Sequence, residues 1–515
     1  MPTAPYPRTL PALYDRCVVR GGPGEAVRGD GRSLTFREVD TLADRLAAGL
    51  LAGGVAPGDR VAVLLENRPE VPVVDVAIAR AGGVKVPVNP MVADPECAHV
   101  LGDADPTAIV TDAKGAERLE TIDADDPEVF VLGEDGPGLD AIGADPDAVT
   151  VPEVAATDDA AQYYTGGTTG DPKGVVYTHE VLVENLLAHL AEFDVGETDL
   201  GLLVTPLSHS AGTFLWMGLL SGGTVVVQDG FDVDRFADRV AADGVTWTML
   251  VPTMLYRLLD ADGVVADLRS LRRLFYGTAP VRPARIAEAV ERFDAGFVQF
   301  YGQTEVPNLV TTLGVRAHER AVADDDLTAL RSAGTPAHRV ALRTVDPETG
   351  DQTDPGTPGE VVVAAPYVFD RYHERPDRTA ETLRDGWVHT GDVGRIEPDG
   401  SLTLLDRKGN VVVTGGLNVY TTEVERVLSE HPGVADAIVI GVPDPEWGEA
   451  VYAVVERSDG PTAEELREYV GQHLASYKKP KTIEVRESLP RTSLGKLDRQ
   501  SVREEFWADE DRSVH

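Results

Sequence analysis

A run dense in hydroxyl groups and glycines occupies residues 163–174, which read Tyr-Tyr-Thr-Gly-Gly-Thr-Thr-Gly-Asp-Pro-Lys-Gly. Glycine permits backbone conformations that other residues rarely adopt, so several N–H groups can turn inward around an anion. The pattern therefore predicts a polyphosphate cradle, and the alternative is a surface turn that binds nothing. It is not a Walker A loop, because Gly174 follows the lysine. The residues assigned to the cradle are Thr165, Gly166, Gly167, Thr168, Thr169, Gly170 and Lys173.

This stretch resembles the phosphate-binding signature of the adenylate-forming (AMP-forming) ligases, Tyr-Thr-Ser-Gly-Thr-Thr-Gly-x-Pro-Lys-Gly. One residue departs from the signature, because Gly166 stands where the family usually has serine. A hydroxyl group is lost there, and the backbone N–H is kept. Further motifs of the family follow in order along nearly the whole chain. The resemblance is to the acyl-CoA synthetase branch, and it implies ATP, Mg²⁺ and coenzyme A as cofactor and co-substrates.

Residues 301–305, Tyr-Gly-Gln-Thr-Glu, match a second motif of the family. The ring of Tyr301 offers a flat face on which adenine can stack. The hydroxyl of Thr304 can donate to the α-phosphate. Glu305 can hold Mg²⁺, a hard cation that prefers carboxylate oxygen and substrate phosphate. Alone the pentapeptide is weak evidence. It becomes strong evidence because it follows residues 163–174 at the distance along the chain that is usual in the family.

The resemblance assigns other residues to the substrates. His209 corresponds to a histidine that contacts the substrate carboxylate or gates the entry of the thiol. Gln299 stands where the family often meets the adenine amino group. The segment that lines the acyl pocket and one face of the adenine comprises Gly277, Thr278 and Ala279, and the residues that reach the ribose are Asp392 and Arg407. In isolation, His209 is more simply a histidine satisfied in a turn, Asp392 an ordinary turn acid and Arg407 a surface arginine.

The C-terminal part resembles the mobile domain of the family. Gly409 occupies the hinge pivot, where the family usually carries Lys or Asp, so any contact of the usual side chain is lost. Lys496, in Leu489 to Lys496, corresponds to the lysine needed for adenylation; as a mobile cation it can meet charge developing on the α-phosphate. The alternative for Lys496 is a solvated lysine near a terminus. The segment corresponding to the pantetheine tunnel, and thus to the CoA site, contains Gly415, Gly416 and Leu417.

Helix and strand patterns alternate along the N-terminal part. A helix is expected over residues 35–53, begun by a capping box of Thr35 and Glu38, and strands over residues 60–65 and 83–88. The expected fold class is α/β: a large N-terminal domain of several subdomains, with mixed sheets packed by helices, and a small mobile α+β domain. The expected domains are 1–407, for ATP and the acyl substrate, and 408–515, which carries the adenylation lysine. Two more capping boxes are expected in the small domain, at Thr422 with Glu425 and at Thr462 with Glu465.

The net charge of −39 is spread along the chain, and only eight residues are lysine. Such a carboxylate-rich surface is typical of a salt-adapted (halophilic) protein, and it disfavours nucleic acid as a partner. No apolar run is long enough for a transmembrane helix, and the N-terminus lacks the apolar core of a signal peptide. Two cysteines provide no framework of bridges. We therefore expect a reduced, cytoplasmic protein; its oligomeric state does not follow from the sequence.

The resemblance implies that a small-molecule carboxylic acid attacks ATP to give an acyl-adenylate, which then forms acyl-CoA. A medium- or long-chain fatty acid is the expected substrate, because small residues follow His209 and apolar ones are available for a pocket wall. An aromatic acid fits the same features. Two further alternatives are loading of a separate carrier protein and a non-catalytic sensor of acyl groups or nucleotides. The residues on which the pocket depends are Ser210, Ala211, Gly212, Thr213, Trp216, Met217 and Val251.

Overall fold

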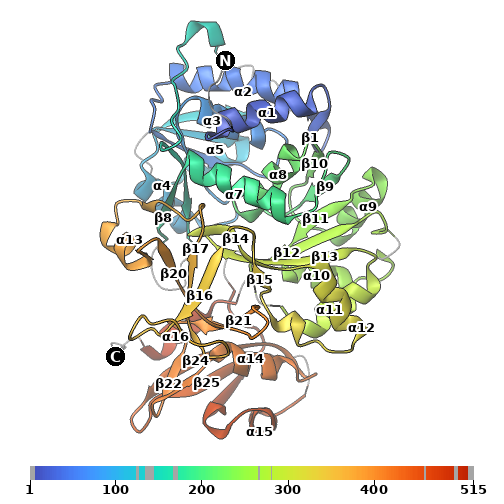
Figure 1. Cartoon of the computed structure of the whole chain (residues 1–515), viewed down its shortest axis with the longest axis vertical. Coiled ribbons are helices and arrows are strands. Elements are labelled where there is room, and N and C mark those ends of the chain that lie inside the picture. The colour runs from blue at the N-terminus through green and yellow to red at the C-terminus, as the bar shows by residue number, and fades with distance from the viewer. Residues whose placement is uncertain are drawn as a thin grey trace. The chain divides into compact units, whose positions relative to one another are not determined.

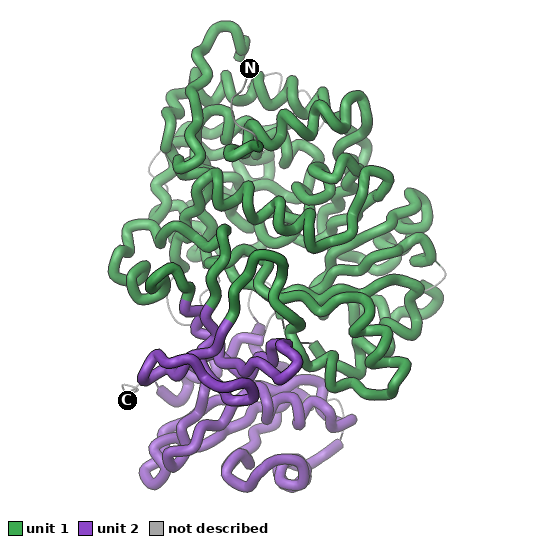
Figure 2. Tube along the Cα trace, viewed as in Figure 1, with its two compact units in different colours: residues 1–165, 172–342, 363–388 green, residues 166–171, 343–362, 389–515 purple. Residues whose placement is uncertain are grey.

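The computed structural model describes residues 6–122, 127–133, 144–165, 172–264, 267–279, 281–457, 460–491 and 497–507. The chain forms two compact units, shown in Figure 2. Unit 1 contains Met1–Thr165, Pro172–Leu342 and Val363–Val388; unit 2 contains Gly166–Asp171, Arg343–Val362 and His389–His515. The sequence predicted a mobile domain that begins after Arg407, and this domain boundary stays a prediction.

The larger sheet of unit 1 has the order β15-β14-β13-β12-β11-β9-β10-β1-β2. Its central neighbours, from β13 to β1, run parallel, whereas β14, β15 and β2 pair antiparallel at the two edges. The strands are β1 (Glu25–Gly29), β2 (Arg32–Thr35), β9 (Leu200–Leu203), β10 (Thr224–Val227), β11 (Trp247–Leu250), β12 (Arg273–Gly277), β13 (Gly296–Gln303), β14 (Val306–Leu313) and β15 (Thr335–Pro336).

The second sheet of unit 1 has the order β18-β8-β7-β4-β3-β5-β6. Strands β3, β4 and β5 are short, mostly buried and rich in valine, isoleucine and alanine, as expected for strands covered on both faces, whereas the edge strand β6 exposes Val129 and Val131. Strands β7 and β8 form an antiparallel pair, and β18 pairs antiparallel with β8. The strands are β3 (Arg60–Leu64), β4 (Val84–Pro87), β5 (Ala108–Asp112), β6 (Glu128–Leu132), β7 (Asp159–Tyr164), β8 (Gly174–Thr178) and β18 (Arg371–Tyr372).

Helices surround both sheets (Figure 1). Helix α2 begins with the expected capping box, in which Thr35 and Glu38 exchange hydrogen bonds. The helices of unit 1 are α1 (Leu10–Gly21), α2 (Phe36–Ala52), α3 (Val71–Arg80), α4 (Asp94–Ala104), α5 (Ala113–Leu119), α7 (His179–Glu192), α8 (Ser210–Leu220), α9 (Val233–Asp243), α10 (Pro252–Asp260), α11 (Pro283–Arg292), α12 (Val315–Ala323) and α13 (Pro376–Thr382). Among the described residues, none of the helices is both long and apolar enough to cross a bilayer.

Unit 2 contains most of a sheet with the order β16-β17-β20-β19, in which β21 also pairs with β20, and a second sheet with the order β23-β22-β25-β24, in which β26 pairs with β25. The C-terminal core lies between that second sheet and helices α14 and α15. The elements are β16 (Ala341–Val345), β17 (Gly359–Ala364), β19 (Leu383–Arg384), β20 (Trp387–Ile396), β21 (Leu402–Arg407), β22 (Val412–Thr414), β23 (Leu417–Val419), α14 (Thr421–Ser429), β24 (Val434–Asp444), β25 (Gly448–Arg457), α15 (Ala463–His473), β26 (Thr482–Arg486) and α16 (Arg499–Trp507). The fold class predicted from the sequence is confirmed.

One of the two capping boxes expected in the small domain is wrong. The box of Thr462 and Glu465 is present at the start of α15. At α14 the first residue is Thr421, and no side chain of the N-cap residue caps the helix. The hydroxyl of Thr422 donates instead to the carbonyl of Leu405. The capping function belongs to Asp406, whose Oδ2 accepts from the backbone N–H of Thr421 and, at 2.7 Å, from its hydroxyl.

The acidic surface leads to a prediction about salt. Arg80 lies 2.6 to 3.0 Å from three carboxylates, those of Asp15, Asp40 and Asp44, but exposed ion pairs contribute only ~0.2–1 kcal/mol each. Even if every cation were paired, 39 negative charges would remain. Because their repulsion weakens as the screening length falls from ~10 Å at 0.1 M to ~3 Å at 1 M salt, we expect Tm to rise by several degrees over this range of KCl. Differential scanning fluorimetry measures it, and a Tm that stays flat or falls contradicts the prediction.

Candidate active site

The turn between β13 and β14 presents Thr304 and Glu305. The two strands run antiparallel and leave only these two residues between them. Gly302 is required by the close approach of the strands, because an added Cβ would lie 2.3 Å from the carbonyl carbon of Asn308. Tyr301 lies on the same strand, partly exposed. Tyr301, Thr304 and Glu305 therefore lie at the same end of this hairpin, and their roles toward ATP stay predictions.

Backbone contacts hold this turn from both sides. The hydroxyl of Tyr177, on β8, donates to the carbonyl of Thr304. The N–H of Phe369 donates to the carbonyl of Glu305 at 2.9 Å. Burial raises the pKa of Tyr177 well above its ordinary value, and the nearby charge of Glu305 raises it further. Tyr177 therefore stays a neutral hydrogen-bond donor, and the turn is fixed before any ligand binds.

Glu305 was the residue predicted to hold Mg²⁺. Within the described ranges, no group of three or more His, Cys, Asp or Glu side chains could hold a metal ion unaided. The carboxylate of Glu305 is partly exposed, and its Oε1 accepts a hydrogen bond of 2.6 Å from the hydroxyl of Tyr372. Since Mg²⁺ typically binds through one or two carboxylates together with water and substrate phosphates, this donor set fits Mg²⁺ that arrives with ATP.

The predicted phosphate cradle is described only at its two ends. Thr165 follows β7 and Lys173 precedes β8, and two hydrogen bonds join these residues. The N–H of Thr165 donates to the carbonyl of Lys173 at 3.1 Å, and the N–H of Lys173 donates to the side-chain hydroxyl of Thr165 at 3.3 Å. The loop is thus closed by the antiparallel pair that flanks it. The predicted residues Gly166, Gly167, Thr168, Thr169 and Gly170 lie outside the described residues.

The predicted adenine segment follows β12. Gly277 lies opposite Phe300 of β13, and an added Cβ there would meet the carbonyl oxygen of Phe300 at 2.3 Å. The next residue, Thr278, has a φ of +67°, a conformation that costs energy for a residue other than glycine. Ala279 follows it. The Oε1 of Gln299, the side chain predicted to meet adenine, accepts a hydrogen bond of 3.3 Å from the buried hydroxyl of Tyr276. This bond restricts the orientation of the Gln299 amide.

His209 directly precedes α8 and is exposed, with its Nδ1 2.8 Å from the carbonyl of Ser208. A polar bridge lies beside it. The hydroxyl of Ser210 donates to Oδ1 of Asn308 at 2.7 Å, and Nδ2 of Asn308 donates to the hydroxyl of Thr213 at 3.0 Å. Asn308 has a φ of +61°. Asn308 lies three residues beyond the Tyr-Gly-Gln-Thr-Glu motif, and no spacing in the sequence identifies it.

Two of the residues proposed for an apolar pocket wall have other roles. The indole N–H of Trp216 donates to Oδ2 of Asp75 at 2.9 Å. Met217 is fully buried in the core. Val251, the third residue, precedes α10 and is partly exposed. The wall of an acyl pocket therefore does not follow from these three residues together.

The predicted ribose pair comes together in unit 2. Asp392 of β20 and Arg407 of β21 are directly opposite each other, and Oδ1 of Asp392 lies 2.6 Å from Nε of Arg407. Asp392 is buried, with 6% of its surface exposed. Glu360, which the sequence analysis missed, is buried beneath this turn, and its Oε1 accepts from the N–H of Gly391 at 3.3 Å.

The predicted CoA segment is a tight hairpin. Gly415 and Gly416 have φ values of +56° and +80° and join β22 to β23, as two-residue hairpin turns require. Leu417 after them is exposed. Trp447, which the sequence analysis missed, is 45% exposed and covers Gly415, whose added Cβ would meet the ring at 2.6 Å. The ammonium group of Lys481 lies 5.5 Å from the centre of that ring.

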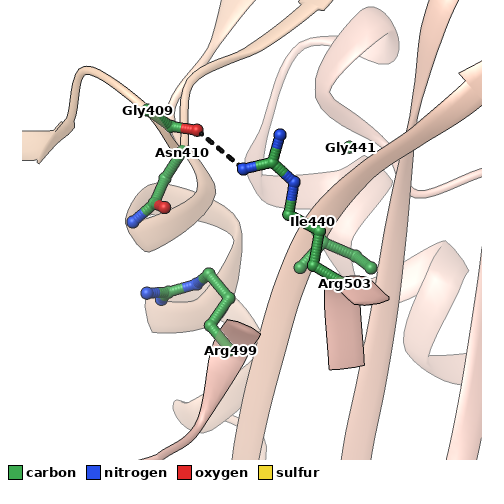
Figure 3. A pocket seen from close by; sticks show the side chains of 6 residues that line it. All are labelled: Gly409, Asn410, Ile440, Gly441, Arg499 and Arg503. Carbon is green, nitrogen blue, oxygen red and sulfur yellow. Dashed lines mark hydrogen bonds between the residues drawn. The ribbon is translucent and has the colours of Figure 1, made fainter. Parts of the chain in front are cut away.

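A small cavity adjoins the predicted hinge residue (Figure 3). The guanidinium of Arg503, on α16, donates to the carbonyl of Gly409 at 3.3 Å. The neighbouring Arg499 pairs with Glu425 at 2.7 Å. Helix α16 therefore holds the backbone at the predicted pivot. The residues that line the cavity are Gly409, Asn410, Ile440, Gly441, Arg499 and Arg503. Lys496, the predicted adenylation lysine, lies outside the described residues.

Comparisons with known proteins agree with these motifs. The AMP-binding enzyme family matches residues 14–373, and the AMP-binding enzyme C-terminal domain matches residues 423–496. A feruloyl-CoA synthase from Amycolatopsis sp is 39% identical over 93% of this chain and 96% of its own length. The fatty acid–[acyl-carrier-protein] ligase ScoC of Streptomyces coeruleorubidus is 37% identical over 95% of both chains. The crystal structure of ATP-bound MatB from Rhodopseudomonas palustris is similar, with a TM-score of 0.87, 30% identity, and coverage of 96% of this chain and 99% of that one.

The motifs, the two matched domains and the near-complete coverage of these relatives point the same way. The alternatives that apply to each motif alone, an ordinary turn or a lone surface residue, do not explain why all the motifs occur together. The chain belongs to the adenylate-forming ligase superfamily, in its acyl-CoA synthetase branch, and is an AMP-forming acid–thiol ligase.

Proposed function

We propose that this ligase activates a medium- or long-chain fatty acid with Mg·ATP and transfers the acyl group to coenzyme A. The observation that carries the reaction type is the rigid two-residue turn of Thr304 and Glu305 between β13 and β14. It holds a hydroxyl donor and a carboxylate side by side, and their backbone is fixed by Tyr177 and Phe369. Preorganised donors of this kind are what stabilise charge as it develops.

In the first half-reaction a carboxylate oxygen attacks the α-phosphorus of ATP, and pyrophosphate leaves. The adenine stacks on Tyr301, and Asp392 accepts from the ribose hydroxyls. Lys173 and the glycine-rich loop hold the β- and γ-phosphates, while Thr304 and Lys496 meet the α-phosphate. Mg²⁺, held by Glu305 and the phosphates, supplies charge neutralisation when bound. The protein itself mainly positions the reactants.

In the second half-reaction the thiol of CoA attacks the acyl carbonyl carbon, and AMP leaves with the bonding electrons. We assign the pantetheine to the hairpin of Gly415 and Gly416. Trp447 offers an exposed ring next to that hairpin, which suits the adenine of CoA. Lys481, whose ammonium group lies over this ring, is paired with Asp444 at 2.6 Å. His209 is assigned to the carboxylate side of the acid.

An aromatic acid is the second candidate, and the polar bridge from Ser210 through Asn308 to Thr213 favours it. Ser210 and Thr213 lie just after His209, where a fatty acid would prefer apolar contacts, and a hydroxylated or methoxylated ring could replace their hydrogen bonds to Asn308. The feruloyl-CoA synthase relative supports the same reading. A separate carrier protein as acceptor, in place of CoA, is suggested by the relation to ScoC.

A panel of carboxylic acids separates these candidates. Pyrophosphate release is measured with fatty acids of eight to sixteen carbons and with benzoate, cinnamate and ferulate, each with CoA, with a phosphopantetheinylated carrier protein, or with neither acceptor. We expect the fatty acids with CoA to give the highest kcat/KM. Faster turnover of the ring acids would favour the second candidate, and turnover that requires the carrier protein would replace CoA as acceptor.

A further inference from the structure

Tyr372 is a buried residue that no motif identified, and it contacts two of the groups assigned to ATP. Its side chain lies on β18 and the residue is only 4% exposed. Its hydroxyl donates to Oε1 of Glu305 at 2.6 Å. The ammonium group of Lys173 lies 5.4 Å from the centre of its ring. One side chain thus connects the carboxylate assigned to the metal with the lysine assigned to the phosphates.

The backbone around Tyr372 is itself well anchored. Its N–H donates to the hydroxyl of Thr379 at 3.0 Å, and its ring packs against that of Phe369 at 4.8 Å between centres. Tyr372 is opposite Val175 of β8, two residues after Lys173. The next N–H, that of His373, donates to the carbonyl of Gly174 at 2.7 Å. The hydroxyl of Tyr372 therefore has a fixed position relative to the end of the phosphate loop.

The chemistry of the contact suits a residue that orients a metal ligand. A tyrosine hydroxyl donates one hydrogen bond and brings no positive charge, so it orients the carboxylate without competing with a cation. The bond engages Oε1 and leaves Oε2 of Glu305 for the metal. Partners that orient a metal ligand in this way typically contribute ~10–100-fold to metal affinity or activity.

We propose that Tyr372 is a positioning residue for Mg·ATP: its hydroxyl orients Glu305 toward the metal, and its ring supports Lys173 toward the phosphates. The inference rests on the proposed use of Mg·ATP. It assigns two separable roles to one side chain. The hydroxyl affects metal binding by orienting Glu305, and the ring affects nucleotide binding through its cation–π contact with Lys173.

The first test removes only the hydroxyl, in Tyr372→Phe, which keeps the ring packed against Phe369. Binding of Mn²⁺, a spectroscopic substitute for Mg²⁺, is measured by electron paramagnetic resonance in the presence of a non-hydrolysable ATP analogue. We expect the Kd for the metal to rise by ~10-fold or more. The half-saturating Mg²⁺ concentration for single-turnover adenylate formation should rise in parallel, and excess Mg²⁺ should restore the rate.

The matched control is Tyr367→Phe. Tyr367 is fully buried, and its hydroxyl donates at 3.0 Å to the carbonyl of Leu309 on β14. The variant therefore removes a hydroxyl that contacts the same hairpin at Leu309 and not at Glu305. Its metal Kd should equal that of the wild type. A metal Kd unchanged in Tyr372→Phe, or raised equally in both variants, overturns the assignment of the hydroxyl.

The second test is Tyr372→Leu, which removes the ring as well. At saturating metal we expect a Kd for the ATP analogue several-fold higher than in Tyr372→Phe, since Lys173 loses its cation–π partner. Equal values in the two variants overturn the assignment of the ring. If the wild-type protein does not bind Mn²⁺ together with the analogue, the proposed use of Mg·ATP fails. If the wild type binds it and the Tyr372→Phe variant binds it equally well, only the role of the Tyr372 hydroxyl fails.

Discussion

Lys496→Ala lowers the rate of adenylate formation by at least ~10²–10³-fold, the usual cost of removing a group that stabilises charge in the transition state. Thioester formation from preformed acyl-adenylate stays within a few-fold of the wild-type rate. The difference arises because the lysine is needed only while the α-phosphate is attacked, and in the proposed second step the small domain has carried it away. Single-turnover assays of the two half-reactions measure both rates.

A lysine far from the proposed chemistry provides the control for this result. Lys114 is exposed and pairs with Glu66, so Lys114→Ala changes the net charge equally and should leave the ratio of the two rates unchanged. Equal losses in both half-reactions of Lys496→Ala would show that the lysine acts in both steps, and the proposal of a residue used in one pose would fail.

Gly409→Pro separates the two half-reactions in another way. If the small domain turns at this residue, its backbone must adopt two states, and proline fixes φ near −65°. We expect adenylate formation to survive and thioester formation to fall by ~10-fold or more, since every 1.4 kcal/mol of strain in the second state costs a factor of ten. The same single-turnover assays compare the two rates.

Gly409→Ala serves as the milder comparison. Gly409 is not one of the glycines with positive φ in this structure, so its present φ is open to alanine, which also reaches the other common regions. It should slow thioester formation much less than proline does. If proline slows both half-reactions equally, or neither, the pivot lies elsewhere in the chain.

Local signals in the sequence were enough to predict some elements of the fold and not others. The capping box of Thr35 and Glu38 is confirmed because its partners are three residues apart. The box at Thr422 is wrong because Asp406, a residue on another element, takes the capping role. Helix α12, in contrast, carries no clear local signal. Only two of its nine residues, His318 and Ala321, are buried, so its inward face is too short to give a helical period in the sequence.

In the candidate site, too, residues within motifs were predictable and residues from distant segments were not. Glu305 and Asp392 were found because each belongs to a motif with fixed spacing. Tyr372, Glu360 and Trp447 were missed, since each comes from a distant segment that strand pairing brings beside the motif. A single tyrosine or tryptophan has no spacing to recognise. The residues assigned to ATP were therefore predictable from motifs, and the residues that lie beside the motifs required the structure.

The hairpin of β13 and β14 also separates what the site must keep from what it can vary. A residue inserted into its two-residue turn would rotate Thr304 or Glu305 to the opposite face, so the turn has no freedom to lengthen. Asn308, only three residues further on, has a φ of +61°, so few residue types fit there. Its partners Ser210 and Thr213 contact it through side chains alone, and exchanging these two leaves the backbone of the turn untouched. Under the proposed assignment, natural selection or laboratory evolution could therefore change which acid is accepted at Ser210 and Thr213 while the turn keeps the same chemistry.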